Sequence, residues 1–287
     1  MDNKNGQGTL YLCATPIGNL SDISKRALET LRNADIIAAE DTRNSIKLLN
    51  HFDIKVPLTS YHEYNKYDKA NELIAKMQAG ADVALVTDAG TPAISDPGQV
   101  IAAMCHEAGI NVVSIPGACA AITALSVSGM DSRRFVFEGF LPPDKKERRE
   151  ILDDLADEMR TIIIYEAPHH LKATLTQLAN ALGDRDMAIC RELTKKYEQV
   201  MRMRLLEAIE YYDSHEPKGE YVLILAGKSR DQVKEEKAGD FLGMDIHEHM
   251  TMYESRGMDH KEAMKKVAAD RGVSKRDIYK ELLEDKE

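Results

Sequence analysis

Short apolar runs alternate with amphipathic segments along the first 128 residues of the chain. Three runs are clear, and each stops at a turn that contains Pro or Gly: residues 9–14, 83–87 and 112–115. The segments between them, such as residues 27–34 and 70–77, repeat apolar side chains at the three- and four-residue spacing of a helix that packs on one face. This alternation predicts βαβ units that form a mostly parallel sheet.

A second alternating set begins near residue 134. It predicts strands at about 134–137, 161–165, 187–190 and 221–225, with a charged helix over 145–158 and another over 170–182. After Gly227 the composition changes to Lys, Glu, Asp and Gln through about Gly239, as in a polar linker. We therefore expect an α/β domain over residues 1–130, a second over 131–229, and a linker with a helical tail over 230–287.

The tail carries helix start and stop signals. Asp259 with Glu262 and Ser274 with Asp277 have capping-box spacing, and Gly257 and Gly272 stand where helices would stop. The stretch 263–283 resembles a helix-turn-helix. Because acidic residues share the final helix with its basic ones, we expect a positioning or packing role rather than DNA binding.

Composition narrows the class of protein. With 43% apolar residues in 287, the chain suits two or three compact units. It lacks both a bilayer-length apolar run and a signal-peptide pattern at its N-terminus, so we expect a cytoplasmic protein without a membrane span. The four cysteines are scattered singly, which predicts reduced core residues and no zinc or redox site.

Charge argues against nonspecific coating of nucleic acid, since 48 acidic residues outnumber 38 basic ones and the formal charge is −10. Local basic clusters still offer a limited surface for phosphates. Taken alone, each cluster fits solvated loops and helix faces better than a phosphate-binding surface. They lie at residues 133–134, 145–149, 195–196 and 202–204.

Three turns follow the three clear strands, at residues 14–20, 87–98 and 115–125. Ligands of parallel sheets bind beyond the carboxyl ends of the strands, so function is expected there. None of the turns contains a dinucleotide or P-loop glycine pattern. The second, with two prolines and two glycines, is longer than a connection needs and indicates a ligand loop. The first also fits an ordinary turn, and the third fits close helix packing.

Polar side chains near these turns supply candidate chemistry. Asp41 or Thr42 could cap a helix or act in the site, while Arg43 could clamp a phosphate, steady a developing alkoxide or form a surface salt bridge. The loop 61–65 suits stacking on an unpaired base, and its His62 is a possible general base or merely solvated. Glu166 ends a buried strand. Adjacent His169 and His170 point apart on a helix, so we expect no metal site.

Taken together, these motifs resemble the methyltransferases of the tetrapyrrole methylase fold, and within them the branch that methylates small-subunit ribosomal RNA. The resemblance covers about residues 8–228, with a helical tail that such enzymes often carry. The matching motifs are residues 15–20, 40–43, 61–63, 87–98, 116–117 and 165–169. The sequence departs from the porphyrin branch, whose second turn reads Gly-Gly-Asp-Pro where this chain has Asp-Ala-Gly-Thr-Pro at 88–92.

The resemblance implies two α/β domains with S-adenosylmethionine in the cleft between them and a homodimer. It implies methylation of a cytidine ribose in the decoding centre of 16S rRNA, within the small ribosomal subunit. The resemblance also implies a set of cofactor contacts, to which we add Asp88 from the turn at residues 87–98. The residues expected to contact the cofactor are Pro16, Asp88, Ala89, Gly90, Thr91, Ile94, Cys119, Ala120 and Glu166. For the substrate we expect Arg43, Tyr61, His62 and Glu63, and for catalysis Arg43, Glu166 and His62.

Methyl transfer from a sulfonium needs mainly an in-line approach to about 3 Å, and a base near the ribose hydroxyl would help. We expect the second turn to hold the cofactor chiefly through backbone atoms of Ala89, Gly90 and Thr91. Two alternatives remain: a porphyrin-precursor methyltransferase of the same fold, and a nucleic-acid-binding regulator whose α/β body only senses a ligand.

Overall fold

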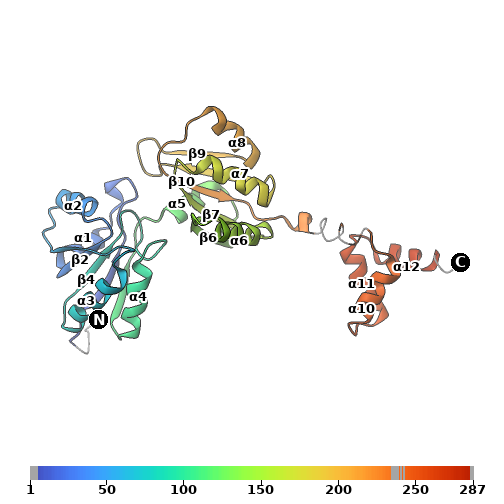
Figure 1. Ribbon diagram of the computed structural model, residues 1–287, viewed down its shortest axis with the longest axis horizontal. Coiled ribbons are helices and arrows are strands. Elements are labelled where there is room, and N and C mark those ends of the chain that lie inside the picture. Colours follow the sequence, from blue (N-terminus) through green and yellow to red (C-terminus); the bar gives the residue numbers. More distant parts are fainter. Residues whose placement is uncertain (1–5, 234–238, 240, 242, 285–287) are drawn as a thin grey trace.

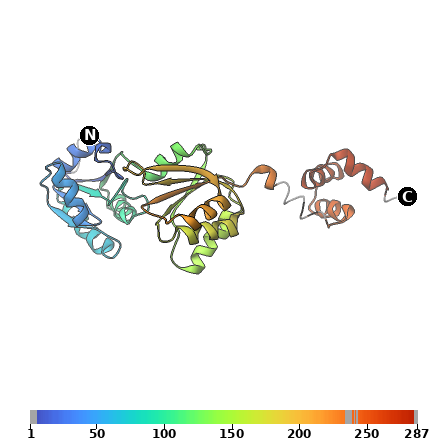
Figure 2. The same ribbon diagram turned by 90° about the horizontal axis from the view of Figure 1, so that it is seen from above.

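The computed structural model describes residues 6–233, 239, 241 and 243–284. Two α/β units lie side by side, and a group of helices stands beyond the second unit (Figure 1). The view from above has the same three parts in one row, from the blue N-terminal unit to the red C-terminal helices (Figure 2). The α/β class and the helical tail expected from the sequence are confirmed.

The first unit contains a parallel five-stranded sheet of order β3-β2-β4-β1-β5. Helices cover both faces: one core cluster packs beneath α3 and α4, the other beneath α1 and α2. The short β3, after Pro57, is too brief for periodicity to reveal and was not predicted. The elements are β1 (Thr9–Cys13), η1 (Leu20–Asp22), α1 (Lys25–Asn33), β2 (Ile36–Ala39), α2 (Thr42–His51), β3 (Leu58–Ser60), α3 (Lys66–Gln78), β4 (Val83–Val86), α4 (Gly98–Glu107) and β5 (Asn111–Ile115).

The second unit contains a mixed five-stranded sheet of order β6-β7-β10-β8-β9, in which only β6 and β7 pair in parallel. The basic run 202–204 lies in its edge strand β9, which the sequence analysis missed. Helices α6, α7 and α8 cover one face. The elements are β6 (Phe135–Phe140), α6 (Lys145–Ala156), β7 (Thr161–Glu166), α7 (Leu171–Leu182), β8 (Asp186–Arg191), β9 (Gln199–Arg204), α8 (Leu205–Ser214) and β10 (Tyr221–Leu225).

Helix α5 (Ala120–Ser128) belongs to the first unit by the predicted division at residue 130, yet it packs on the free face of the second sheet. Its Ala121, Ala124 and Leu125 are buried against Ile163 and Val222, among others. Ile17, from the turn after β1, joins the same cluster. The two units are therefore joined by an apolar contact as well as by the chain.

The C-terminal helices α10 (Ile246–Glu254), α11 (His260–Asp270) and α12 (Lys275–Glu284) share a small core of their own. The expected caps are confirmed, since Asp259 accepts a hydrogen bond from the Glu262 N–H and Ser274 accepts one from the Asp277 N–H. Gly272, with φ +67°, makes the turn between α11 and α12. Part of the predicted linker, residues 234–238, lies outside the described residues.

The cysteines are all free, and Cys13, Cys105 and Cys190 are buried, as expected for reduced core residues. Cys119 is only partly buried. Within the described ranges, none of the helices combines the length and apolar character that crossing a bilayer requires.

Arg185 joins the ends of several elements in the second unit. It is 5% exposed, and its guanidinium donates hydrogen bonds to the carbonyls of Ala156, Glu158, Leu182 and Ala226. These acceptors lie at the ends of α6, α7 and β10. The side chain thus supplies donors to carbonyl groups at the ends of these elements, of which the Glu158 carbonyl also accepts from the Lys228 N–H at 2.7 Å.

Arg185→Met should lower the free energy of unfolding by about 2–4 kcal/mol, because buried carbonyls lose their donors. The measurement is urea denaturation followed by circular dichroism. Arg204→Met is the matched control: Arg204 is half-exposed and pairs with Asp184 at the surface, so its loss should cost less than about 1 kcal/mol. Equal effects of the two substitutions would contradict this role for Arg185.

Candidate active site

A cavity of about 470 Å³ lies between the two α/β units. This volume is in the range of small-molecule sites, about 300–1,000 Å³. The first unit contributes the turn after β4 and Glu40, at the carboxyl edge of its sheet, and the second contributes the end of β7 and the loop after β8. The lining includes Ile17, Glu40, residues 87–91, residues 94–96, Cys119, Ala120, Phe140, residues 165–168, Cys190, Glu192, Leu193, Lys195 and residues 220–222.

The cavity brings together nearly all the residues predicted to contact the cofactor. Pro16 is the exception: it is buried and does not line the cavity, whereas its neighbour Ile17 does. The predicted residues found on the wall are Asp88, Ala89, Gly90, Thr91, Ile94, Cys119, Ala120 and Glu166. Their contact with a cofactor stays a prediction.

The three turns are fastened to one another. Thr15 and Gly90 exchange backbone hydrogen bonds of 2.8 and 3.1 Å, and the Thr15 hydroxyl donates to the Thr87 carbonyl at 3.3 Å. The Thr91 hydroxyl donates to the Ala118 carbonyl at 3.0 Å. The backbone N–H and C=O of Gly90 are therefore engaged with Thr15, which does not fit the expectation that they hold a ligand. Ala89 and Thr91 remain candidates for backbone contacts.

The second turn is held in an unusual conformation around Asp96. Ala93 and Ser95 have φ values of +69° and +64°, in the left-handed region that non-glycine residues rarely adopt. Asp96 Oδ1 accepts hydrogen bonds from the N–H groups of Ala93 at 2.9 Å and Gly98 at 2.7 Å. Asp96 Oδ2 is buried, with no hydrogen-bond partner in the described part of the chain. Burial raises the pKa of this carboxyl, against the backbone hydrogen bonds that lower it.

Glu166 is 5% exposed and forms part of the cavity wall. Its Oε1 accepts a hydrogen bond from the Ala167 N–H at 2.8 Å, and its Oε2 accepts one from the Thr174 hydroxyl. Arg148 reaches the same group: its guanidinium donates to Thr174 at 2.6 Å and lies 4.0 Å from Glu166. Arg148 thus belongs to an internal network rather than to the basic surface suggested by the run 145–149.

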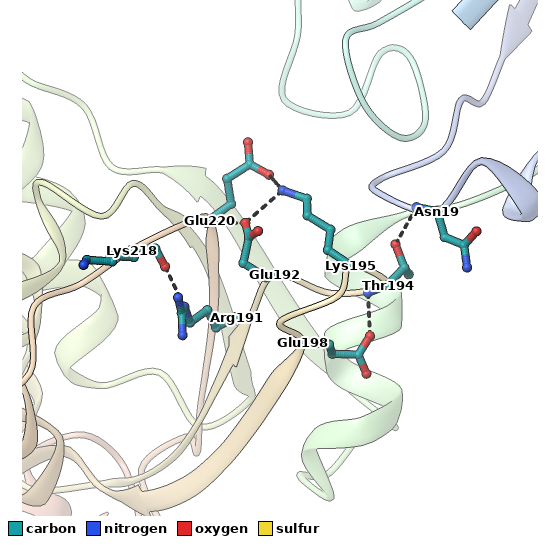
Figure 3. A network of polar contacts seen from close by, with 8 residues as sticks. All are labelled: Asn19, Arg191, Glu192, Thr194, Lys195, Glu198, Lys218 and Glu220. Carbon is teal, nitrogen blue, oxygen red and sulfur yellow. Dashed lines mark hydrogen bonds and ion pairs between the residues drawn. The ribbon is translucent and has the colours of Figure 1, made fainter. Parts of the chain in front are cut away.

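The loop after β8 contributes Glu192, Leu193 and Lys195 to the cavity wall. Figure 3 shows the polar contacts of this loop. Lys195 Nζ lies 2.8 Å from both Glu192 and Glu220. Burial lowers the pKa of Lys195, but these hydrogen bonds outweigh it and hold the pKa above its ordinary value. Glu192 and Thr194 have φ values of +51° and +65°. The cluster 195–196, interpreted as a basic surface, therefore contributes a lysine that is already neutralised.

That loop also contacts the first unit. The Thr194 hydroxyl accepts a hydrogen bond from the Asn19 N–H at 3.1 Å, as Figure 3 shows. A Cβ on Gly18 would lie 2.4 Å from Lys195 Cγ and 3.2 Å from the Leu193 carbonyl oxygen. Only a residue without a side chain allows this approach.

Arg43 lies outside the cavity, since it is not among the wall residues. Its side chain is 87% exposed and pairs with Asp41, with Nη2 lying 3.0 Å from Oδ2. Of the two capping candidates, Asp41 is the one that caps α2, and its hydrogen bonds with Arg43 hold its pKa below the usual value. The Asp41 N–H donates to Asp88 Oδ1 at 3.1 Å, so this pair adjoins the cavity wall at Asp88.

The Tyr61 cluster is arranged differently from the expectation. Tyr61 is 1% exposed and lies in the core cluster beneath α3 and α4, where its hydroxyl donates to the Pro97 carbonyl at 3.0 Å. Its ring therefore cannot stack on a substrate base. His62 is partly buried, with Nδ1 unpartnered among the described residues, and does not line the cavity. Glu63 pairs with Lys66, and Tyr64 is 97% exposed.

Several wall residues were missed from the sequence, notably Glu40, Phe140, Tyr165 and Lys195. Glu40 could have been predicted, because it directly follows β2 at the same sheet edge as the turns. In the structure it accepts a hydrogen bond from the Thr87 hydroxyl at 2.9 Å. Tyr165 precedes Glu166 in a recognised motif. Phe140 gave no signal, and Lys195 was noted only as part of a basic cluster, since only the packing of the two units brings these residues to the cavity.

No group of three or more His, Cys, Asp or Glu side chains suited to a metal ion occurs in the described ranges. The expectation that His169 and His170 point apart on a helix is wrong: both precede α7, and their ring centroids are 4.1 Å apart.

The fold and this cavity define the class of protein. The family model described as Tetrapyrrole (Corrin/Porphyrin) Methylases matches residues 9–209, and the chain belongs to this family. It is a methyltransferase, and methyltransferases of this family use S-adenosylmethionine.

Among its relatives are proteins named ribosomal RNA small subunit methyltransferase I. The one from Synechocystis sp. is 48% identical over 96% of this chain and 98% of its own length. The one from Halalkalibacterium halodurans is 49% identical over 96% of this chain and 95% of its own length. Among similar solved structures is a diphthine synthase, with a TM-score of 0.60 and 16% sequence identity over 77% of this chain and 91% of that one. Another is a uroporphyrin-III-C-methyltransferase from Thermus thermophilus, with a TM-score of 0.55 and 19% identity over 77% of this chain and 94% of that one. These two support the fold alone.

Gly18→Ala should weaken the binding of S-adenosylmethionine roughly ten-fold, because the new methyl group displaces the loop 193–195, and such overpacking costs typically 1–3 kcal/mol. Titration calorimetry measures the effect. Gly243→Ala, whose Cβ would meet nothing within 4 Å, is the control and should bind as the wild type does. Unchanged affinity in Gly18→Ala would refute the idea that this contact shapes the cavity.

Asp96→Asn should make the protein more stable near neutral pH. The amide oxygen keeps both backbone hydrogen bonds, and the buried negative charge is removed. Since burial raises the pKa of Asp96, the folded state favours the protonated acid. The gain should therefore shrink as the pH falls through that pKa and the wild-type carboxyl becomes neutral. Thermal unfolding between pH 3.5 and 8 tests this; a gain independent of pH would contradict it.

Proposed function

We propose that this methyltransferase transfers the methyl group of S-adenosylmethionine to the 2′-hydroxyl of a cytidine ribose in 16S rRNA. Relatives at 45–49% identity, over nearly the whole chain, are named ribosomal RNA small subunit methyltransferase I. The observation that carries the proposal from the structure is the cavity between the two units, walled by turns from one and carboxylates from the other.

The wall suits S-adenosylmethionine. Apolar side chains such as Ile17, Leu193 and Val222 can enclose the adenine and the aliphatic part of the cofactor. Carboxylates, among them Asp88 and Glu166, can accept hydrogen bonds from its ribose hydroxyls and its ammonium group. The cofactor supplies an activated methyl group, so the protein's task is chiefly positioning.

The chain's own residues then orient the acceptor. The hydrogen bonds from Ala167 and Thr174 fix the Glu166 carboxylate on the wall before a ligand arrives. A carboxylate so held can accept a hydrogen bond from the acceptor hydroxyl, or from the cofactor, without reorganising. Of the three candidates for catalysis, Glu166 is the one in the cavity wall. We assign no chemical step to His62 or Arg43.

Arg43 is better suited to the RNA backbone. Its exposed guanidinium adjoins the cavity wall through Asp41 and Asp88, and a phosphate could be bound there. Exposed Tyr64 offers the loop 61–65 an aromatic surface in place of Tyr61. His62 and Glu63 remain candidate RNA contacts beside it.

We further propose that the protein acts as a homodimer on the small ribosomal subunit in the cytoplasm. The support is the family resemblance and the substrate itself, because the relatives are named for small-subunit ribosomal RNA. The C-terminal helices would position the subunit. Their separate core indicates that they fold as a unit attached to the catalytic body.

Labelled S-adenosylmethionine should transfer its methyl group to 16S rRNA when the purified protein meets small subunits from cells that lack the modification. Ribose methylation makes one phosphodiester bond resistant to alkali, so alkaline hydrolysis should leave a labelled dinucleotide containing cytidine. Large subunits are the negative control.

Two other outcomes would overturn the proposal. Label in uroporphyrinogen, with none in RNA, would favour a porphyrin-precursor methyltransferase. Binding of promoter DNA that depends on residues 243–284, without any turnover of cofactor, would favour a regulator.

A further inference from the structure

Phe140 owes its position to an irregularity in strand β6. The pairing of β6 with β7 shifts register between Phe137 and Gly139, and Gly139 has a φ of +63°. Such a bulge changes the direction in which the next side chain points. Phe140 consequently contributes to the cavity, although β6 is the edge strand of the sheet.

The same bulge touches the second turn of the first unit. A Cβ on Gly139 would lie 2.7 Å from Ser95 Oγ, so the two units approach closely beside Phe140. Ser95 is itself held at a φ of +64°. The place of Phe140 is thus determined from both units.

The ring of Phe140 is supported from one side. Its centroid lies 5.5 Å from that of Tyr165 in an edge-to-face arrangement, and Tyr165 makes a second such contact with Phe137 at 5.0 Å. The Tyr165 hydroxyl accepts a hydrogen bond from the Ala121 N–H at 3.1 Å, which fixes the supporting ring. Phe140 therefore rests on an ordered aromatic pair.

The wall residues differ in how much of each side chain is exposed, and this separates the mouth of the cavity from its floor. Val222 and Glu166 are 6% and 5% exposed, whereas Phe140 is 57% exposed and Ile94 44%. The half-buried Ala167 and Pro168 complete this side of the wall. The mouth thus presents an exposed aromatic ring, in edge contact with Tyr165, beside apolar neighbours.

We propose that Phe140 is the platform on which the base of the acceptor nucleotide stacks. The inference rests on the proposed function and adds a residue that determines how the substrate binds. Proteins that recognise single-stranded RNA stack unpaired bases on aromatic side chains. A ribose 2′-oxygen is three bonds from its base nitrogen, so when the hydroxyl enters the cavity the base stays at the mouth.

Substitutions at position 140 separate stacking from mere apolar contact. Phe140→Leu keeps an apolar side chain without the ring, and it should raise the KM for small ribosomal subunits on the order of ten-fold, the range of one lost base stack. Its Kd for S-adenosylmethionine should not change, and kcat should change less than KM. Phe140→Tyr should retain a KM close to that of the wild type.

Phe135→Leu is the matched control, because Phe135 lies on the same strand, is 38% exposed, and does not line the cavity. Its KM should equal that of the wild type. Titration calorimetry with S-adenosylmethionine verifies that each variant is folded and competent to bind the cofactor.

The outcomes distinguish this inference from the proposed function. If wild-type protein methylates RNA and Phe140→Leu has an unchanged KM, the platform is refuted and the proposed function stands. A weaker Kd for S-adenosylmethionine in Phe140→Leu, with an unchanged KM for subunits, would assign the ring to the cofactor instead. If wild-type protein transfers no label to RNA, the proposed function fails and the platform with it.

Discussion

The close approach of the two α/β units at two glycines is the constraint on which the site depends. Gly18 lets the first turn meet the loop after β8, and Gly139 lets the bulge of β6 meet Ser95. Between them Ile17 packs into the apolar cluster of the second sheet. A side chain at either glycine would clash with the other unit, at the loop 193–195 or at Ser95, and would disturb the wall they form together.

The polar groups of the cavity are ordered before any ligand binds. Thr15, Thr91 and Asp96 fasten the turns of the first unit by hydrogen bonds, while Thr174 and Arg148 fasten Glu166 in the second. Such preorganisation suits a reaction in which the leaving group is already activated and geometry limits the rate. The network also explains why a charged run such as 145–149 is a poor guide to surface charge: Arg148 is turned inward.

The sequence predicted most of the regular elements, because buried strands such as β4 and β10 are unbroken apolar runs. It also located the cavity wall, since turns after parallel strands meet at one edge. It missed β3 and β9, which are too short or too polar for periodicity to reveal. The burial of Tyr61 and the neutralisation of Lys195 depend on partners far along the chain, Pro97 and Glu220, and local pattern carries no information about them.

Left-handed backbone at Ala93, Ser95, Glu192 and Thr194 has a consequence for how this protein can change. All four lie in the two loops that border the cavity, at backbone conformations that glycine adopts with less strain. Replacing them with glycine would relieve backbone strain, yet Ser95 and Thr194 are among the residues through which the units touch. Substitutions that raise the thermal stability of these loops would thus alter the shape of the site. In these loops, stability and activity place opposite demands on the sequence.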